Sequence, residues 1–489
     1  METDASQKVL CRFVTKLPDE LKVPSTDIAL PSNSTRYGLS QTINALLSTA
    51  DEDDEEGPKV FDFLVSGELL RGELARHLAK RGLSVEKTIV IEYFFALEPP
   101  QPPKELDLPD WVGAVRGHGD LLFSGSYDGG VSMHRTSSGE GEVLQGSKVA
   151  HSDSVSALAV VKVSEEGPQG DDSSVSSMHG GGQILVTASK DSSMRGWFVN
   201  KAGGEAGGDG GKRRRKKGAG GKAGATGLDL VQVFEFVGHT GGVESVASSP
   251  GCGRFCSGGW DQKVRVWSID EEDIAGAQLN AAKKQKKATE ELPENTVSLE
   301  QVETTFLEGH KQCISSVCWP EENLICSASW DCTVKCFDVS KGKMVSNLIR
   351  DSALFCLDSS RDAGHSGSLS LAFGSADGLV AVWDPRESFR AKEKGTGMAL
   401  ATVKSFKSHK AVVADIRWSP SSPFHFASCD YDGLVKVWDM RSSMPLHSIE
   451  LHGDKALCLD WFSAGTLASG GADRKVALQG MAVMAGEKQ

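Results

Sequence analysis

Residues 324–338 read Leu-Ile-Cys-Ser-Ala-Ser-Trp-Asp-Cys-Thr-Val-Lys-Cys-Phe-Asp. Two apolar runs flank a short polar turn, a pattern that is typical of a β-hairpin. The acid in the turn, Asp331, suits its position because the carboxylate accepts backbone N–H bonds. About 21 residues earlier stand Gly309 and His310, and an apolar run between them and the hairpin indicates another strand. The stretch therefore predicts a unit of four short antiparallel strands.

The same phrase occurs seven times between residues 125 and 480 as two small residues, one variable residue and an Asp, followed by an apolar strand. The Asp residues are Asp128, Asp191, Asp261, Asp331, Asp377, Asp432 and Asp473. Six residues after five of them stand the aromatics Trp197, Trp267, Phe337, Trp383 and Trp438. The histidine before the hairpin returns as His239, His310 and His409, and again at His452. We expect these histidines to hydrogen-bond inside each unit and support the Asp turn, and not to bind metal.

A repeat of this kind resembles the WD repeat, which starts with Gly-His and ends with Trp-Asp. The spacing agrees once three inserts, 162–182, 200–228 and 270–301, are set aside as segments that cannot be strands. The rest of 111–489 then holds about 42 residues per repeat, within the ~40–45 of a WD repeat. The sequence therefore predicts a seven-bladed WD-repeat β-propeller over 111–489. Its first and seventh copies are atypical, with His134 and Gln479 at the aromatic position, as terminal repeats often are.

Composition narrows the class of protein. The 489 residues have a formal net charge of −13, which argues against a clamp on nucleic acid by the whole chain. We expect no membrane span or signal peptide, because no apolar run reaches 18 residues and the start lacks a basic and an apolar region. Eleven scattered cysteines fit free thiols in a reducing compartment. With no phosphate-binding Gly loop or nucleophile elbow, we predict no enzyme, no cofactor and no metal of its own.

Residues 8–97 lack the repeat and predict a ubiquitin-like α+β domain. Strands are expected near 9–16, 61–65 and 88–94, with a helix over 38–47 for which Ser40 is the N-cap. A second helix, over 73–80, is expected to end at Gly82. A Pro-rich linker, 98–110, then leads to the propeller. The fold class is therefore mainly β, with the α+β domain preceding the propeller.

Three stretches of this domain carry a more specific resemblance: Arg-Tyr-Gly-Leu-Ser at 36–40, Phe-Asp-Phe-Leu-Val-Ser-Gly-Glu-Leu-Leu-Arg at 61–71, and Gly-Leu-Ser-Val-Glu at 82–86. They resemble a Notchless-like N-terminal domain. Joined through the Pro-rich linker to seven WD repeats, the chain resembles the WD-repeat subunit of the Pescadillo–Bop–WD-repeat (PeBoW) complex. The resemblance covers nearly the whole chain outside the three inserts.

That resemblance implies a scaffold in large (60S) subunit biogenesis and pre-rRNA processing. The propeller would bind the Bop-type WD-repeat partner, alongside a Pescadillo-type protein, on the pre-60S particle. The ubiquitin-like domain would dock on midasin, an AAA ATPase, by giving a carboxylate to the Mg²⁺ of its adhesion-site domain. The position that matches the family's acid is Glu86, and Glu68 and Glu73 are nearby competitors. ATP hydrolysis by midasin would then release this chain from the pre-ribosome.

Two basic runs lie in the inserts. The first comprises Lys212, Arg213, Arg214, Arg215, Lys216 and Lys217, and the second lies at 283–287. The first predicts a nuclear localisation signal, so we expect the protein in the nucleus, nucleolus and nucleoplasm. Contact with RNA phosphates is open, because no aromatic platform for base stacking is interleaved with these charges.

An alternative reading is a WD-repeat substrate receptor of a cullin-type ubiquitin ligase. Trp-Asp-Pro-Arg at 383–386 and Trp-Asp-Met-Arg at 438–441 both fit a Trp-Asp-x-Arg signature of such receptors. The pattern is also common in other WD repeats, so it is a weak signal. Co-purification separates the two readings, with Bop-type and Pescadillo-type proteins for the first and a cullin adaptor for the second.

Overall fold

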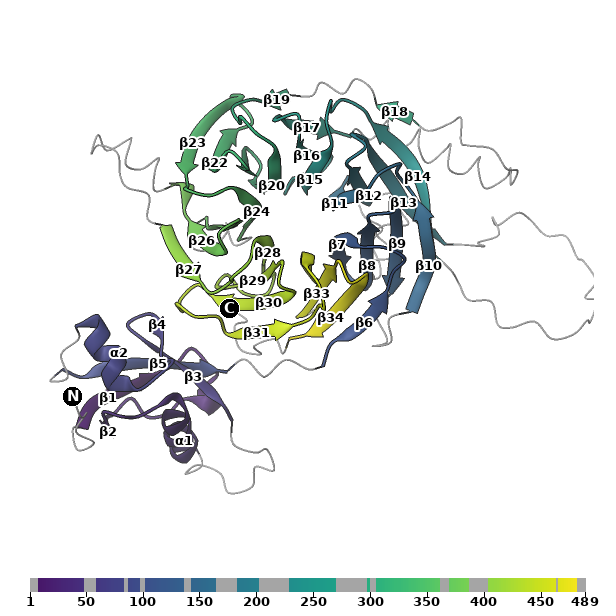
Figure 1. The fold of residues 1–489 in the computed structure, drawn as a ribbon. Coiled ribbons are helices and arrows are strands. Elements are labelled where there is room, and N and C mark those ends of the chain that lie inside the picture. Colours follow the sequence, from purple (N-terminus) through teal and green to yellow (C-terminus); the bar gives the residue numbers. More distant parts are fainter. Residues whose placement is uncertain are drawn as a thin grey trace, which may run out of the picture. The chain divides into compact units, whose positions relative to one another are not determined.

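The chain is described from a computed structural model, shown in Figure 1. It describes residues 8–47, 59–82, 87–96, 102–135, 142–163, 183–201, 228–269, 297–299, 305–360, 369–386, 403–462 and 465–481. The chain divides into two compact units, the first made of residues 1–101, 438–447 and 480–489 and the second of residues 102–437 and 448–479. The predicted class, mainly β with an N-terminal α+β domain, is confirmed.

The N-terminal domain is one mixed sheet with two helices. Its elements are β1 (Lys8–Val14), a 3-10 turn (Asp19–Leu21), β2 (Asp27–Pro31), α1 (Arg36–Leu47), β3 (Phe61–Val65), β4 (Glu68–Leu69), α2 (Leu74–Arg81) and β5 (Ile89–Phe95). The strand order is β2-β1-β5-β3-β4. The central pair, β1 and β5, is parallel, and the other pairs are antiparallel.

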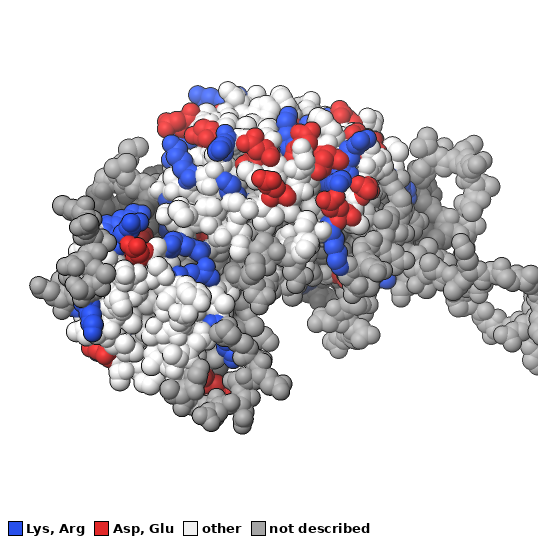
Figure 2. Space-filling model, turned by 60° about the horizontal axis from the view of Figure 1, so that its bottom comes forward, with Lys and Arg blue, Asp and Glu red and all other residues white. Residues whose placement is uncertain are grey.

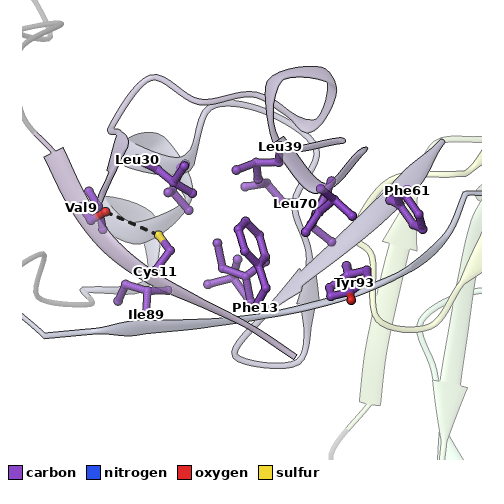
Figure 3. Packing of buried hydrophobic residues seen from close by; sticks show 14 of the residues in the cluster. Val9, Cys11, Phe13, Leu30, Leu39, Phe61, Leu70, Ile89 and Tyr93 are labelled. Carbon is purple, nitrogen blue, oxygen red and sulfur yellow. Dashed lines mark hydrogen bonds between the residues drawn. The ribbon is translucent and has the colours of Figure 1, made fainter. Parts of the chain in front are cut away.

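The core of this domain lies between the sheet and its helices. Residues of β1 alternate between buried and exposed, as a strand with one covered face requires. Figure 3 shows Phe13, Leu39, Phe61 and Tyr93 converging in this core. On the other face of β1, Leu10 and its neighbours of the same parity are exposed, so one face of the sheet is open.

The sequence placed the helices correctly but misplaced one helix start. α1 begins at Arg36, so Ser40 is no N-cap; it is buried within the helix. Its hydroxyl accepts a hydrogen bond from the Phe61 N–H at 3.1 Å and donates one to the Lys59 carbonyl at 3.3 Å. The expected end of α2 is confirmed, because Gly82 adopts φ 63° and its N–H bonds to the last helical turn. β2 was not predicted.

Seven further sheets, counted within the described residues, form the blades of the propeller (Figure 1). Blades 1 to 3 contain β7 (Val112–His118), β8 (Leu121–Ser126), β9 (Gly130–Arg135) and β10 (Glu142–Val149); β11 (Val155–Lys162), β12 (Gln183–Ser189), β13 (Met194–Lys201) and β14 (Leu228–Phe236); and β15 (Val243–Ser248), β16 (Arg254–Gly259), β17 (Val264–Ser268) and β19 (Thr305–Leu307).

Blades 4 to 6 each follow the chain in order. They contain β20 (Ile314–Glu321), β21 (Leu324–Ser329), β22 (Thr333–Asp338) and β23 (Lys343–Ile349); β24 (Leu354–Ser359), β25 (Leu371–Ser375), β26 (Leu379–Trp383) and β27 (Val403–Lys407); and β28 (Val413–Trp418), β29 (His425–Asp430), β30 (Leu434–Asp439) and β31 (His447–Glu450). The seven-bladed prediction is thereby confirmed.

Blade 7 closes the ring with a strand from the other end of the propeller. It consists of β32 (Ala456–Phe462), β33 (Thr466–Gly471), β34 (Lys475–Gly480) and β6 (Lys104–Asp107). β6 pairs antiparallel with β34. The propeller therefore begins before residue 111, and the predicted linker, 98–110, contains a strand. Joining the two ends in one sheet removes an exposed edge.

The insert bounds need correction, because β11 extends to Lys162, β13 extends to Lys201 and β14 starts at Leu228, all within the predicted inserts 162–182 and 200–228. β18 (Val297–Leu299), inside the third predicted insert, pairs in parallel with β14 of blade 2, so 270–301 is not free of strands. The rest of that insert up to residue 296, like 164–182 and 202–227, lies outside the described residues.

The small residues of the repeated phrase follow from the packing of one blade on the next. A Cβ added at Gly125 would lie 2.5 Å from a methyl carbon of Val155, which belongs to the following blade. Gly470 meets Val112 at the same 2.5 Å across the closure of the ring. A side chain at these positions would displace the neighbouring blade, so the phrase requires a small residue there.

Candidate functional site: the channel rim and the N-terminal domain

The repeated histidines and acids form hydrogen-bonded networks inside the blades. In blade 3, His239 Nδ1 lies 2.8 Å from Asp261 Oδ2, and its Nε2 lies 2.6 Å from the Ser257 hydroxyl. The Trp267 indole N–H donates to the same hydroxyl at 2.8 Å. In blade 4, His310 repeats this with Asp331 at 2.9 Å, where Phe337 replaces the tryptophan.

Each acid also holds its own turn. Asp331 Oδ1 accepts the Thr333 N–H at 3.1 Å, and Asp261 Oδ1 accepts the Lys263 N–H at 3.3 Å. Burial acts to raise the pKa of Asp261, but the hydrogen bond and charge of His239, the Lys263 N–H and the charge of Arg265 together outweigh it, so the pKa lies below its usual value. Burial lowers the pKa of His310 despite the opposing effect of Asp331. These groups are buried in the blades and have a structural role.

Blade 6 departs from the sequence prediction. His409 pairs with Asp430 at 2.6 Å and not with Asp432, which is exposed. Asp430 also accepts the N–H groups of Leu434, at 3.0 Å, and of Asp432, at 3.1 Å. Asp430 stands where other copies have a small residue, two positions before the turn acid. From there its carboxylate reaches both the histidine and the turn.

Blade 2 has a network that the sequence analysis missed. His151 lies 3.3 Å from Asp191, and its Nε2 lies 2.7 Å from the Thr187 hydroxyl, to which Trp197 donates at 3.1 Å. Because the first insert lies between them, His151 and Asp191 are about twice as far apart in the sequence as the histidine and acid of the other repeats, so the pair was not recognised. The Ala-His start before an apolar run was the signal that could have found it.

The remaining blades keep parts of the network. In blade 7, His452 lies 3.0 Å from Asp473, and the buried Gln479 stands at the aromatic position. In blade 1, His134 lies there instead, 3.0 Å from the Ser124 hydroxyl. The turn acid of blade 1 is Asp128, whose carboxylate accepts the Gly130 N–H at 2.8 Å. The turn acid of blade 5 is Asp377, which accepts the Leu379 N–H at 3.3 Å. Trp383 and Trp438 are buried.

An aromatic rim surrounds one end of the propeller channel. The variable residue of the repeated phrase is Tyr127, Lys190, Trp260, Trp330 and Tyr431 in blades 1, 2, 3, 4 and 6, and all five line one cavity of about 420 Å³ together with Phe355. Trp260 and Trp330 meet edge to face at 5.0 Å, and Trp330 lies 5.8 Å from Phe355. We call these six residues, with Trp111, the channel rim.

The rim combines exposed aromatic surface with fixed polar groups. Trp260 is 49% exposed and Trp111 41% exposed. The Trp260 indole N–H donates to Glu244 at 2.6 Å, and the Lys190 ammonium lies 5.2 Å from the centre of the Tyr127 ring. Burial raises the pKa of Tyr127, so its phenol stays neutral. Such a surface can take up an apolar or cationic group of a partner.

The N-terminal domain offers a second candidate surface beside the predicted acid. Glu86 lies outside the described residues, which resume at Lys87. A cavity of about 410 Å³ is lined by Val14, Ser66, Lys87, Val90 and Glu92, among others. Val90 is 52% exposed, and Leu10, on the same open face of the sheet, is 44% exposed. The residues next to Glu86 thus border a partly apolar open surface.

The two competing acids of this domain have internal partners. Glu68 forms an ion pair with Arg81, with Arg81 Nε donating to Oε2 at 2.8 Å. Glu73, at the start of α2, lies 3.3 Å from Arg76. Both carboxylates are therefore partly neutralised within the domain, which weighs against them as ligands for a metal ion on another protein.

Comparison with known proteins identifies the two kinds of unit. Residues 9–78 match the NLE (NUC135) domain, and residues 230–268, 301–338 and 400–439 match the WD domain, G-beta repeat. A protein of Oryza sativa subsp. japonica described as a ribosome biogenesis protein WDR12 homolog is 36% identical over 478 residues, 97% of each chain. The chain belongs to the WDR12 family of ribosome biogenesis proteins.

Other WDR12 homologs agree over the whole length. The Arabidopsis thaliana protein is 33% identical over 472 residues, 96% of each chain, and the Chlamydomonas reinhardtii protein is 34% identical over 485 residues, covering 95% of this chain and 96% of that protein. The predicted resemblance to the PeBoW WD-repeat subunit is confirmed at the level of the family. Membership of the WDR12 family gives the chain a role in ribosome biogenesis.

The structure bears on the alternative prediction, a substrate receptor of a cullin-type ubiquitin ligase. The arginines of both Trp-Asp-x-Arg signatures have acidic partners: Arg386 pairs with Glu321, and Arg441 binds Asp439 through two nitrogens at 2.7 and 3.0 Å. A cullin adaptor would have to compete with these acids for the two arginines.

In the described residues no group of three or more metal-ligating side chains gathers, and no helix there is long and apolar enough to cross a membrane.

Charge on the described surface is mixed. Figure 2 shows Lys and Arg interspersed with Asp and Glu over the part of the propeller that it draws. The predicted nuclear localisation run, Lys212 to Lys217, lies outside the described residues. All eleven cysteines are free, and most are buried.

Proposed function

We propose that this chain is a non-enzymatic scaffold of large (60S) subunit assembly with two working ends. The channel rim binds the propeller of a Bop-type WD-repeat partner, in a complex with a Pescadillo-type protein on the pre-60S particle. The N-terminal domain docks on the adhesion-site domain of midasin, whose ATP hydrolysis removes the chain. The first basic run directs the chain to the nucleus, where the particle matures in the nucleolus and nucleoplasm.

The observation that carries the binding role is the channel rim. Aromatic side chains from five different blades converge on one cavity, and Trp260 leaves about half of its surface exposed there. Exposed Trp and Tyr clustered around a cavity are the residues that most often dominate protein interfaces. The network histidines, in contrast, are buried in the blades and have almost no surface to offer a partner.

The proposed docking of the N-terminal domain on midasin rests on the position of Glu86. In the sequence it follows the α2 cap and precedes β5, and its neighbour Lys87 lines the cavity on the partly apolar open face of the sheet. Mg²⁺ accepts single carboxylate oxygens and retains water ligands, so one acid supplied by a partner can make docking depend on the metal. The metal belongs to midasin, and this chain needs no cofactor. Because Glu68 and Glu73 have internal cationic partners, Glu86 is the acid that we assign to this contact.

A pull-down from nuclear extract tests the proposal. Wild type is compared with Trp260→Ala/Trp330→Ala, with Glu86→Ala, and with Phe306→Ala, an exposed aromatic of β19 outside the rim (52% exposed). We expect wild type and Phe306→Ala to recover Bop-type and Pescadillo-type proteins, pre-60S particles and midasin. Trp260→Ala/Trp330→Ala should fail to recover the Bop-type and Pescadillo-type proteins, and Glu86→Ala should fail to recover midasin alone. Recovery of a cullin adaptor instead, or equal recovery by all four proteins, would contradict the proposal.

A further inference from the structure

The strand that closes the ring is also the strand next to the N-terminal domain in the chain. β5 ends at Phe95 and β6 begins at Lys104, so eight residues, 96–103, join them. β6 completes blade 7, the blade that combines strands from the two ends of the propeller. Along the chain, β6 is therefore the first propeller strand after the N-terminal domain, so tension carried by residues 96–103 acts on β6 first.

The outer edge of blade 7 is weakly held. β6 has four residues, and its register with β34 runs from Lys104 opposite Leu478 to Asp107 opposite Lys475. Leu106 is its one half-buried apolar residue. The Lys475–Glu105 ion pair is 38% and 44% exposed, and exposed pairs contribute little. Short, exposed edges of this kind open most easily.

The inner edge of the same closure is held by buried groups. Asp460, on β32, accepts the Gly117 N–H of β7 at 2.8 Å and lies 3.5 Å from Arg116. The Cys458 thiol donates to the Val112 carbonyl at 3.5 Å. The charged side chains of Arg116 and Asp460 are only 16% and 10% exposed. β32 and β7 thus remain tied when the outer edge is disturbed.

Charged residues also connect the innermost strands of the neighbouring blades on this side of the ring. At one shared position of the innermost strands, blades 5, 6, 7 and 1 have alternating charges: Asp358, Arg417, Asp460 and Arg116. Asp358 accepts the Trp418 N–H of the next blade at 2.8 Å. The same position in blades 2 to 4 holds Ala159, Ala247 and Cys318. The charged positions are therefore those around the closure.

β6 also leads directly to the channel rim. Four residues after Asp107 stands Trp111, whose ring lies 5.5 Å from that of Tyr127. The Trp111 carbonyl accepts the Tyr127 N–H at 2.8 Å, and the Leu108 N–H donates to the Arg474 carbonyl at 2.8 Å. Displacement of β6 would first break the bond of Leu108 and then pull on Trp111 at the rim.

We propose that β6 is a release strap. Tension on the N-terminal domain peels β6 from β34, starting at Lys104, while the buried contacts between β32 and β7 keep the ring from unravelling. The displaced chain then draws Trp111 from Tyr127 and weakens the hold of the rim on its partner. The inference rests on the proposed function, in which midasin pulls on the N-terminal domain.

A cross-link across the strap tests it on the full chain. Asp107 and Lys475 are opposite each other in the register and not buried, so Asp107→Cys/Lys475→Cys is compared oxidised and reduced, with Lys475→Cys alone as control. The chain, carrying Lys341→Cys in the exposed turn between β22 and β23, is stretched in an optical trap between its N-terminus and that position. The reduced form and the control should show an early extension on the order of 20 Å, whereas in the oxidised form the cross-link should stop peeling at Asp107 and limit the extension to about 10 Å.

Two results would overturn the strap. One is an early extension that is the same in the oxidised and reduced forms; the other is unfolding of the ring in a single event with no early extension. ATP-driven release from pre-60S particles by midasin provides the second readout. Binding of the adhesion-site domain should be equal in both forms, with release blocked only by the cross-link. Equal release of the oxidised and reduced forms would also refute the strap. If neither form binds the adhesion-site domain, the proposed midasin contact is refuted, and the stretching experiment alone decides whether β6 is a strap.

Discussion

The indole rings of Trp260 and Trp330 meet edge to face, with centroids 5.0 Å apart and planes at 81°, although the two residues belong to neighbouring blades. Each is the variable residue of its repeat, directly before the turn acid. The repeat thus separates two tasks: the small residues and the turn acid build the blade, and the variable position lines the channel cavity in five of the blades.

Replacing Trp330 should weaken partner binding without unfolding the ring. Trp330 contacts both Trp260 and Phe355, so Trp330→Ala removes the centre of the cluster. We expect a loss of about 30-fold in affinity for the Bop-type propeller, roughly 2 kcal/mol, as for an interface hot spot. Calorimetric titration measures it, with Phe306→Ala as the matched exposed aromatic. An equal loss in both variants would argue against the rim.

Blade 6 provides a pair of adjacent acids with opposite expectations. Asp430 is fully buried and bonds His409, whereas Asp432 is exposed. Asp430→Ala should lower the free energy of unfolding by about 1–3 kcal/mol because it leaves buried donors unpaired. Asp432→Ala should change it by less than about 0.5 kcal/mol. Thermal unfolding of the two variants distinguishes them, and a larger effect at Asp432 would refute the assignment of Asp430.

His134 predicts a loss of stability in acid. Burial lowers its pKa to about 4, below the ~6.5 of an unfolded histidine. The unfolded chain therefore takes up the proton first, so this contribution is complete above about pH 6.5 and is lost as the pH falls from 6.5 to 4. The loss is at most about 3 kcal/mol. His134→Gln, which copies Gln479 of blade 7, should flatten the unfolding profile over that range; an unchanged profile would contradict the account.

Glu86→Ala should abolish metal-dependent docking and leave the fold intact. The residue precedes β5 in the sequence, and the described core of the domain is formed by other residues. Affinity for the midasin adhesion-site domain, measured with Mg²⁺ and with chelator, should fall to the chelator level in this variant. Glu20→Ala, an exposed acid of the same domain, is the control. Retained Mg²⁺-dependent binding by Glu86→Ala would reassign the contact.

The sequence predicted the parts of the fold that repeat or alternate. Seven turn acids, with a period of about 42 residues once the three inserts are set aside, indicated the ring, and the alternation of apolar and polar residues placed β1. β6 escaped because Leu106 is its one large apolar residue, and because its partner strand lies about 370 residues away. Neither local pattern nor propensity reports such pairing. The channel rim escaped for a similar reason, since its members are one residue from each of several blades.

Errors at single residues also have physical causes. Ser40 looks like an N-cap by composition, but its hydroxyl serves the Phe61 and Lys59 backbone from inside α1. Asp432 fits the spacing of the repeat, but Asp430, two residues earlier, makes the bond to His409 in its place. In both cases a tertiary contact decides between positions that the sequence pattern treats as equivalent.

The most direct test of a scaffold with two separate working ends is one calorimetric series. The full chain, Trp260→Ala/Trp330→Ala and Glu86→Ala are each titrated with the Bop-type propeller and with the Mg²⁺-loaded adhesion-site domain of midasin. The account predicts that the rim variant loses the first interaction and keeps the second, and that Glu86→Ala does the reverse. Loss of both interactions in either variant, or of neither in both, would contradict it.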